Sequence, residues 1–131
     1  SVTHATPAAG FAHTPERNWE NDSELPIEAK TKGCRDIARQ FVEFSHGDGI
    51  DVLLGGGRSH FLPKDSMHAN GKREDGINLI SKWQQRNPNG RYFHNRRQLI
   101  AYQNRDTDKI LGLFSGSSPL KISLTYILAT L

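Results

Sequence analysis

The segment Ile50-Asp51-Val52-Leu53-Leu54-Gly55-Gly56-Gly57 decides the fold of this 131-residue chain. Its first five residues form a short run rich in leucine and β-branched side chains. A strand that is apolar at nearly every position is buried on both faces, as in a parallel sheet covered by helices. The three glycines then end the strand abruptly. This segment therefore predicts a buried parallel strand, and with it an α/β fold.

The clearest helix precedes this strand and is predicted over residues 34–44. Apolar side chains recur there with the spacing i, i+3, i+4, i+7 and i+8, which places them on one face. They are Cys34, Ile37, Ala38, Phe41 and Val42. The pattern predicts that this face packs on the core and that Cys34 is a small buried side chain.

The rest of the chain continues the alternation of strands and helices. Residues 1–6 are expected to be the end of a strand, which places His4 and Thr6 on one face because side chains alternate along a strand. The further expected elements are a helix over 8–12, loops over 14–33 and 61–73, a helix around 77–83, a strand over 91–94, a helix capped by Asn95, and a strand over 109–114. This order predicts a three-layer α/β/α sandwich with a mostly parallel sheet.

Composition and charge exclude some classes of protein. Lysine and arginine number 17 against 14 acidic residues, and most of the basic excess lies in residues 82–109. The aromatic residues in this stretch do not match the interleaving pattern of single-strand binders, so a solvated face is favoured over nucleic-acid binding. The single cysteine excludes an internal disulfide. No apolar run reaches membrane-spanning length, and the N-terminus lacks a signal-peptide pattern.

Most generic motifs in the chain are weak. The glycine turn followed by Arg58 could bring backbone N–H groups to a phosphate, but the Walker and dinucleotide patterns are absent, which favours a strand-exit turn. No histidine pair has zinc-ligand spacing. The two Asp-Ser pairs, ending at Ser23 and Ser66, are interpreted as ordinary loop serines.

Three residues near the N-terminus suggest phosphate and metal chemistry. Thr6 offers a hydroxyl that suits Mg²⁺ when carboxylates complete the coordination shell. His4 could hydrogen-bond a metal-bound water, and Arg17 has a planar fork that grips two phosphate oxygens. The alternative is a buried structural histidine together with an Arg17 that pairs with Glu20 or Asp22.

Several motifs occur together in one order and spacing: His4-Ala5-Thr6-Pro7-Ala8, Ala12-His13-Thr14, Arg17-Asn18-Trp19 with Asp22, Gly33-Cys34-Arg35-Asp36-Ile37-Ala38, Asp51 through Arg58, and Gly112-Leu113-Phe114. Together they resemble the metal-dependent alkaline phosphatases, in the branch that has histidine at the His4 position. Aligned motifs are far more specific than any one alone. The resemblance covers residues 1–114 and implies a partial alkaline phosphatase domain there.

The resemblance also implies roles. Thr6 would be the hydroxyl ligand of a magnesium ion, His4 would lie in its second shell, and Arg17 would bind the phosphoryl oxygens. Two zinc ions would accompany the magnesium, and hydrolysis of phosphomonoesters would pass through a phosphoserine. The parent enzyme would be a homodimer, secreted or membrane-anchored, and extracellular or periplasmic, with no nucleic acid as partner.

Other parts of the family's active site are expected outside this chain. The resemblance places the nucleophilic serine and a disulfide partner for Cys34 before residue 1, and the zinc ligands before residue 1 or beyond the last residue. The chain is thus expected to be an internal segment that is inactive alone. Residues 115–131 do not match the family, and either a frameshift or real divergence would explain such a tail.

Two other functions stay open at this point. One is a non-catalytic phosphate- or nucleic-acid-binding module built on residues 55–58 and 82–109. The other is a segment without independent function that folds poorly alone, because its strands lack neighbours.

Overall fold

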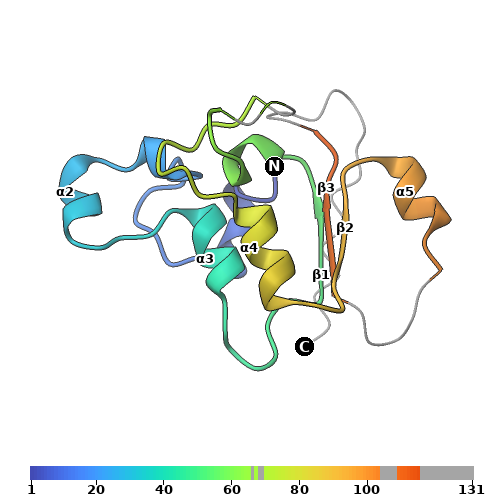
Figure 1. Ribbon diagram of the computed structural model, residues 1–131. Helices are drawn as coiled ribbons and strands as arrows, with labels where there is room; N and C mark the ends of the chain where they lie inside the picture. The colour runs from blue at the N-terminus through green and yellow to red at the C-terminus, as the bar shows by residue number, and fades with distance from the viewer. Residues whose placement is uncertain (66, 68–69, 104–108, 116–131) are drawn as a thin grey trace.

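The computed structural model describes residues 1–65, 67, 70–103 and 109–115. Its sheet has three parallel strands in the spatial order β1 (Val52–Gly55), β3 (Ile110–Leu113), β2 (Arg91–Phe93). Helices α3 (Ile37–Glu43) and α4 (Leu79–Arg86) cover one face, and α5 (Arg96–Ala101) lies on the other (Figure 1). The predicted α/β architecture with a parallel sheet and helices on both faces is confirmed.

The core lies between the sheet and helices α3 and α4. The central strand contributes Leu111 and Leu113, both fully buried, and β1 contributes Leu53. The apolar stripe of α3 faces them as predicted, except at its first position, and Phe41 packs edge-on against Phe11 and Phe61. Helix α4 adds Leu79, Ile80 and Trp83.

Side-chain caps set where the helices begin. Helix α3 begins at Ile37 because the Asp36 carboxylate accepts a hydrogen bond from the Arg39 amide at 2.9 Å. Cys34 lies before this cap and is exposed, so the prediction that it packs on the buried face was wrong. Asn95 caps α5 as predicted, accepting from the Gln98 amide at 2.9 Å.

The N-terminal strand was also predicted wrongly. Residues 1–4 form a turn, and helix α1 (Ala5–Ala9) follows at once. The Val2 amide donates to the Gly56 carbonyl at 2.9 Å, but no ladder of such bonds extends along the described residues. Helix α1 starts earlier than the expected 8–12 because proline is tolerated in the first helical turn. His4 and Thr6 therefore do not share a strand face.

Short helical turns occupy regions that were expected to be loops. They are η1 (Asp22–Glu24), α2 (Ile27–Thr31) and η2 (Arg58–Phe61). Elements this short carry no periodic pattern, so the sequence gives no signal for them. No helix in the described part of the chain is long and apolar enough to cross a membrane.

Candidate functional site

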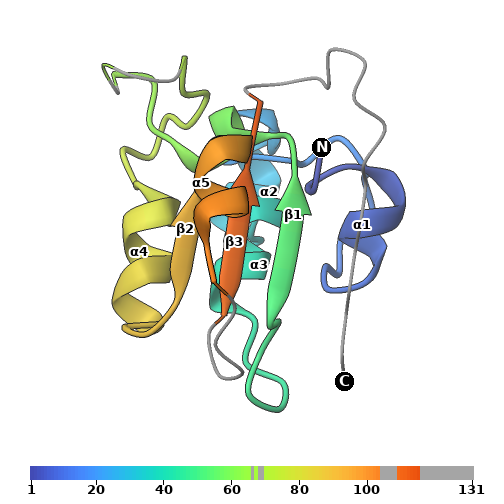
Figure 2. The ribbon, with the colours of Figure 1, turned by 90° about the vertical axis from the view of Figure 1, so that its right-hand side faces the viewer.

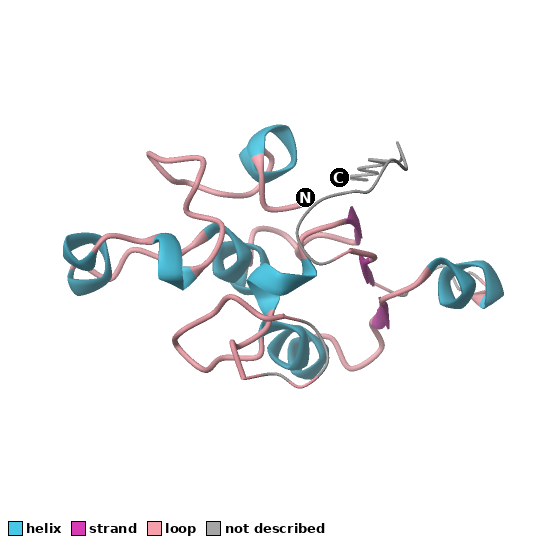
Figure 3. Ribbon diagram, turned by 90° about the horizontal axis from the view of Figure 1, so that it is seen from above, coloured by secondary structure: helices cyan, strands magenta, loops and turns pink. Residues whose placement is uncertain are grey.

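The N-terminal turn lies at the carboxyl ends of the strands. Figure 2 shows the N-terminus beside the tip of β1, with α1 beyond that edge of the sheet, and Figure 3 shows the same arrangement from above. The bond between Val2 and Gly56 fixes this position. Ligands of open α/β sheets bind at this end, so the residues gathered here form the candidate site.

The Glu20 carboxylate, which is 15% exposed, organises the contacts at this end of the molecule. Glu20 Oε2 accepts hydrogen bonds from Thr3 Oγ1 at 2.6 Å and Ser1 Oγ at 3.1 Å, and it lies 3.4 Å from His60 Nε2. Glu20 Oε1 lies 3.2 Å from His4 Nδ1, without hydrogen-bond alignment. We call these five residues the Glu20 cluster. Burial alone would raise the pKa of Glu20, but the Thr3 hydrogen bond, the nearby imidazoles and the Ser1 hydrogen bond together lower it.

The His60 side chain is only 3% exposed, and its ring is neutral. Its Nδ1 lies 2.9 Å from Asn21 Nδ2, while Asn21 Oδ1 accepts from the amide and hydroxyl of Ser23. The Asn21 amide nitrogen therefore donates to His60 Nδ1, which leaves the ring proton on Nε2, facing Glu20. Burial lowers the pKa of His60 to about 4.

The residues predicted to serve a metal are not assembled into a metal site. His4 precedes α1 and is 42% exposed, and Thr6 is exposed on α1. Within the described part of the chain, no group of three or more His, Cys, Asp or Glu side chains could hold a metal ion. The donor set present here therefore does not fit a zinc or magnesium site by itself.

Arg17 is exposed, and the acids near it in sequence are engaged elsewhere. Glu20 belongs to its own cluster, and Asp22 accepts from the amides of Glu74 at 3.1 Å and Asp75 at 2.9 Å. Arg17 makes no side-chain hydrogen bond or ion pair with the residues that the structure describes. The alternative in which Arg17 pairs with Glu20 or Asp22 is not seen.

A second arginine, Arg73, belongs to no pattern in the sequence that indicates a role for it. Its side chain is completely buried, and its two terminal nitrogens each contact an oxygen of Asp36 at 3.0 Å. Its Nε donates to Asp75 at 3.1 Å, and Asp22 lies 3.7 Å away. Burial would lower the pKa of Arg73, but these hydrogen bonds outweigh it and raise the pKa. We call Arg73 with the three aspartates the Arg73 hub; it joins the N-terminus of α3, residues 73–75 and the start of η1.

Sequence comparison decides the family. The profile of the alkaline phosphatase family matches residues 1–125. The chain belongs to the alkaline phosphatase family. It is 40% identical over 123 residues to an alkaline phosphatase of Gadus morhua, covering 86% of this chain and 25% of that protein. It is also 40% identical over 124 residues to a membrane-bound alkaline phosphatase of Bombyx mori, covering 88% of this chain and 22% of that protein.

The chain is also 40% identical over 124 residues to a tissue-nonspecific isozyme of alkaline phosphatase from Gallus gallus. That match covers 86% of this chain and 24% of the relative, so the chain spans about a quarter of the length of these proteins. The resemblance read from the motifs is confirmed. The division at residue 114 stays a prediction, because residues 116–131 lie outside the described residues.

In this alkaline phosphatase segment the glycine turn does not cradle a phosphate. The amides of Gly57 and Arg58 both donate to the Ser115 carbonyl, at 3.1 and 3.0 Å. Gly57 has a φ of +100°, which favours glycine, and a side chain there would collide with Ser1. The turn therefore ends the strand, and its amides are already occupied.

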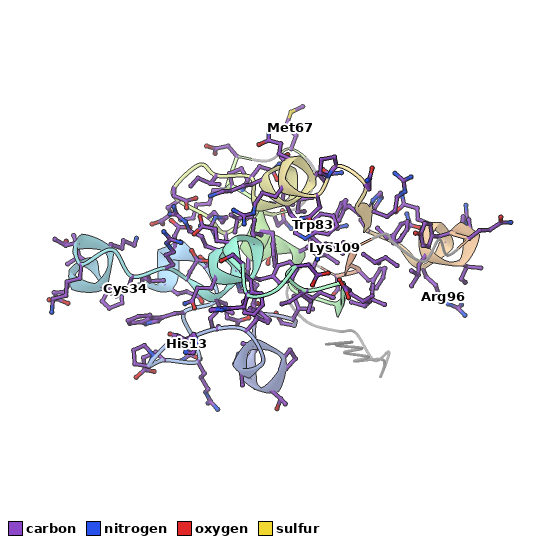
Figure 4. All side chains as sticks on the ribbon, turned by 90° about the horizontal axis from the view of Figure 1, so that it is seen from below. His13, Cys34, Met67, Trp83, Arg96 and Lys109 are labelled. Carbon is purple, nitrogen blue, oxygen red and sulfur yellow. The ribbon has the colours of Figure 1, made fainter. Side chains whose placement is uncertain are left out.

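The described basic residues over 82–109 of the alkaline phosphatase segment do not gather on one face of the sheet. Lys82 pairs with Glu43 at 2.6 Å, and Lys109 lies 3.3 Å from Asp51. Figure 4 shows Arg96 projecting from α5, on the opposite side of the sheet from α4. This arrangement does not favour a nucleic-acid-binding module. Ser23 is a structural serine bonded to Asn21, and Ser66 lies outside the described residues.

Proposed function

We propose that this segment supplies the phosphate-binding arginine, Arg17, of an enzyme that hydrolyses phosphomonoesters through a phosphoserine formed on a residue outside this chain. The observation that carries the proposal is the state of Arg17. It is exposed and has no partner among the described residues, while Glu20 and Asp22 nearby are bound to other groups. A guanidinium that no acid of the described residues occupies is available for an anionic ligand.

The chemistry of the guanidinium suits a phosphoryl group. Its planar fork donates two parallel hydrogen bonds to two oxygens of one phosphate. Such contacts hold the substrate in line for displacement and stabilise charge on the equatorial oxygens of the transition state. Lysine offers a point charge without this geometry.

Thr6 and His4 belong to the finer part of the proposal. Thr6 would give its hydroxyl to a magnesium ion, and His4 would accept a hydrogen bond from a water bound there. Bound zinc and magnesium would supply an activated nucleophile and charge neutralisation. The described residues include no group of three or more His, Cys, Asp or Glu side chains that could hold such an ion, so these roles require groups from the rest of the enzyme.

We further propose that the 131 residues alone do not turn over phosphomonoesters, and that the whole enzyme is a dimer that is secreted or membrane-anchored. A p-nitrophenyl phosphate assay with Zn²⁺ and Mg²⁺ checks the first statement. Turnover above that of a Thr6→Ala/Arg17→Ala control would contradict it.

The test of Arg17 uses a full-length enzyme that carries this segment. Replacing Arg17 with alanine removes a bidentate charged contact worth about 1.5–3 kcal/mol, which raises the inhibition constant of inorganic phosphate about 10- to 150-fold. Arg35→Ala is the matched control, because Arg35 is an exposed arginine that pairs with Glu43 instead. An unchanged inhibition constant in Arg17→Ala would contradict the assignment of Arg17 as the phosphate-binding arginine.

A further inference from the structure

The backbone just after Arg17 is tied to the start of α3. The Ile37 amide donates to the Trp19 carbonyl at 2.8 Å, and the Ala38 amide donates to the Glu20 carbonyl at 3.3 Å. The first amides of a helix have no partner within it, so this segment completes the hydrogen bonding of the helix N-terminus. Arg17 itself lies in the tight turn that precedes this anchor, in which the Trp19 amide donates to Glu16.

Asp22 ties the other end of the segment to the Arg73 hub. Both oxygens of its carboxylate accept from the Glu74 amide at 3.1 Å, and Oδ2 also accepts from the Asp75 amide at 2.9 Å. The side chain is only 13% exposed, and Arg73 lies 3.7 Å from it. Asp22 is therefore the member of the hub that belongs to the segment of Arg17.

We propose that Asp22 is a positioning residue for Arg17: it locks residues 19–22 onto the Arg73 hub and so holds the exposed guanidinium where phosphate binds. The inference rests on the function proposed above for Arg17. Binding is strongest when the binding group is held in place beforehand, because less freedom is lost when the ligand arrives. A loosened segment would leave Arg17 present and charged but poorly placed.

The hub offers a matched control in Asp75. Its side chain contacts Arg73 as Asp22 does, and more closely, accepting from Arg73 Nε at 3.1 Å and from Nη2 at 2.5 Å. The Asp75 carboxylate also accepts from the Ile77 amide at 3.0 Å, away from residues 17–22. Asp75→Asn therefore disturbs the hub while leaving the hydrogen bonds of Asp22 to the backbone in place.

The experiment is a double-mutant cycle in the full-length enzyme, with the inhibition constant of inorganic phosphate as the readout. We expect Asp22→Asn to raise this constant about 2- to 10-fold, and Asp75→Asn to change it less than about 2-fold. In an Arg17→Ala background, Asp22→Asn should have almost no further effect, because the group that it positions is gone. Asp22→Ser, which keeps one acceptor, provides a second variant if Asp22→Asn does not fold.

The outcomes separate the two proposals. If Arg17→Ala weakens phosphate binding but Asp22→Asn acts no more strongly than Asp75→Asn, the positioning role is wrong and the role of Arg17 stands. An equal effect of Asp22→Asn with and without Arg17 also overturns positioning, since Asp22 would then act through another group. If Arg17→Ala itself has no effect, the proposed function fails, and the inference fails with it.

Discussion

Arg17 and Arg73 carry the same charged group in opposite surroundings. Arg73 is completely buried and faces three aspartates, whereas Arg17 is exposed and has no partner among the described residues. The two are linked, because Asp22, five positions after Arg17, is bound to the hub of Arg73. The buried Arg73 therefore stabilises the fold by pairing with Asp22, Asp36 and Asp75. Because Asp22 is occupied in this way, it does not pair with the exposed Arg17.

The largest effect is expected from removing the buried arginine. Arg73→Met leaves Asp36 buried without its counter-charge, which costs about 3–5 kcal/mol in the free energy of unfolding. Urea denaturation followed by circular dichroism measures it. Lys64→Met is the control, since the pair of Lys64 with Glu74 is exposed and contributes about 1 kcal/mol or less. Equal losses in the two variants would contradict the structural role of Arg73.

His60 connects the hub to the Glu20 cluster, because its carbonyl accepts from Arg73 and its Nε2 faces Glu20. Its pKa is about 4 in the folded state, against 6.5 for an unperturbed histidine. As pH falls below 6.5 the unfolded chain takes up a proton first, so the free energy of unfolding decreases until the pH reaches about 4. The total loss is up to about 3 kcal/mol.

Urea denaturation near pH 7 and again near pH 4.5 checks this pH dependence. A His60→Gln variant should lose most of it, while His13→Gln, at an exposed histidine, should keep it. A full pH dependence in His60→Gln would show that another group is responsible.

A smaller stability loss is expected from Asp75→Asn. The Asp75 carboxylate is 22% exposed and accepts two hydrogen bonds from Arg73, which it shares with Asp36, so removing its charge weakens a charged contact worth about 1.5–3 kcal/mol. Burial raises the pKa of this carboxyl, but the Arg73 hydrogen bond and the other contacts outweigh it and lower the pKa. Thermal unfolding compares this variant with Arg73→Met, and a larger loss for Asp75→Asn would contradict the central place of Arg73.

The smallest effect on stability is expected at the exposed arginine. Arg17→Met removes no contact with the described residues, so without phosphate the free energy of unfolding should change by less than about 0.5 kcal/mol. Denaturation in a phosphate-free buffer measures it. A loss comparable to that of Asp75→Asn would show that Arg17 serves the fold.

Local patterns predicted much of the fold. The apolar run before the glycines and the stripe of Phe41 and its neighbours depend only on residues close in sequence, and the parallel strand and the buried stripe were confirmed. The predicted burial of the strand on both faces was wrong, because β1 lies at the edge of the described sheet and only Leu53 in it is buried. The prediction of a strand over residues 1–6 was wrong. A strand needs a neighbouring strand to pair with, and the alternation of side chains along one segment does not show whether such a neighbour exists. The prediction that Cys34 is buried was wrong because Asp36 caps α3, so the helix begins after Cys34.

The site was less predictable for a physical reason. The contact between Arg73 and Asp36 joins residues 37 positions apart, and the bond between Asn21 and His60 spans 39. No periodic pattern reports contacts of this range. The roles of Arg17, Thr6 and His4 came from the family resemblance and stay predictions.

The most direct test of the account is the thermal stabilisation that phosphate gives to the full-length enzyme, with and without Arg17. A ligand present at about 100 times its Kd stabilises the folded state by about 2.7 kcal/mol. We expect Arg17→Ala to keep the phosphate-free Tm of the unmodified enzyme but to lose most of the rise in Tm on adding inorganic phosphate. The same rise in both proteins would contradict the assignment of Arg17 as the phosphate-binding arginine.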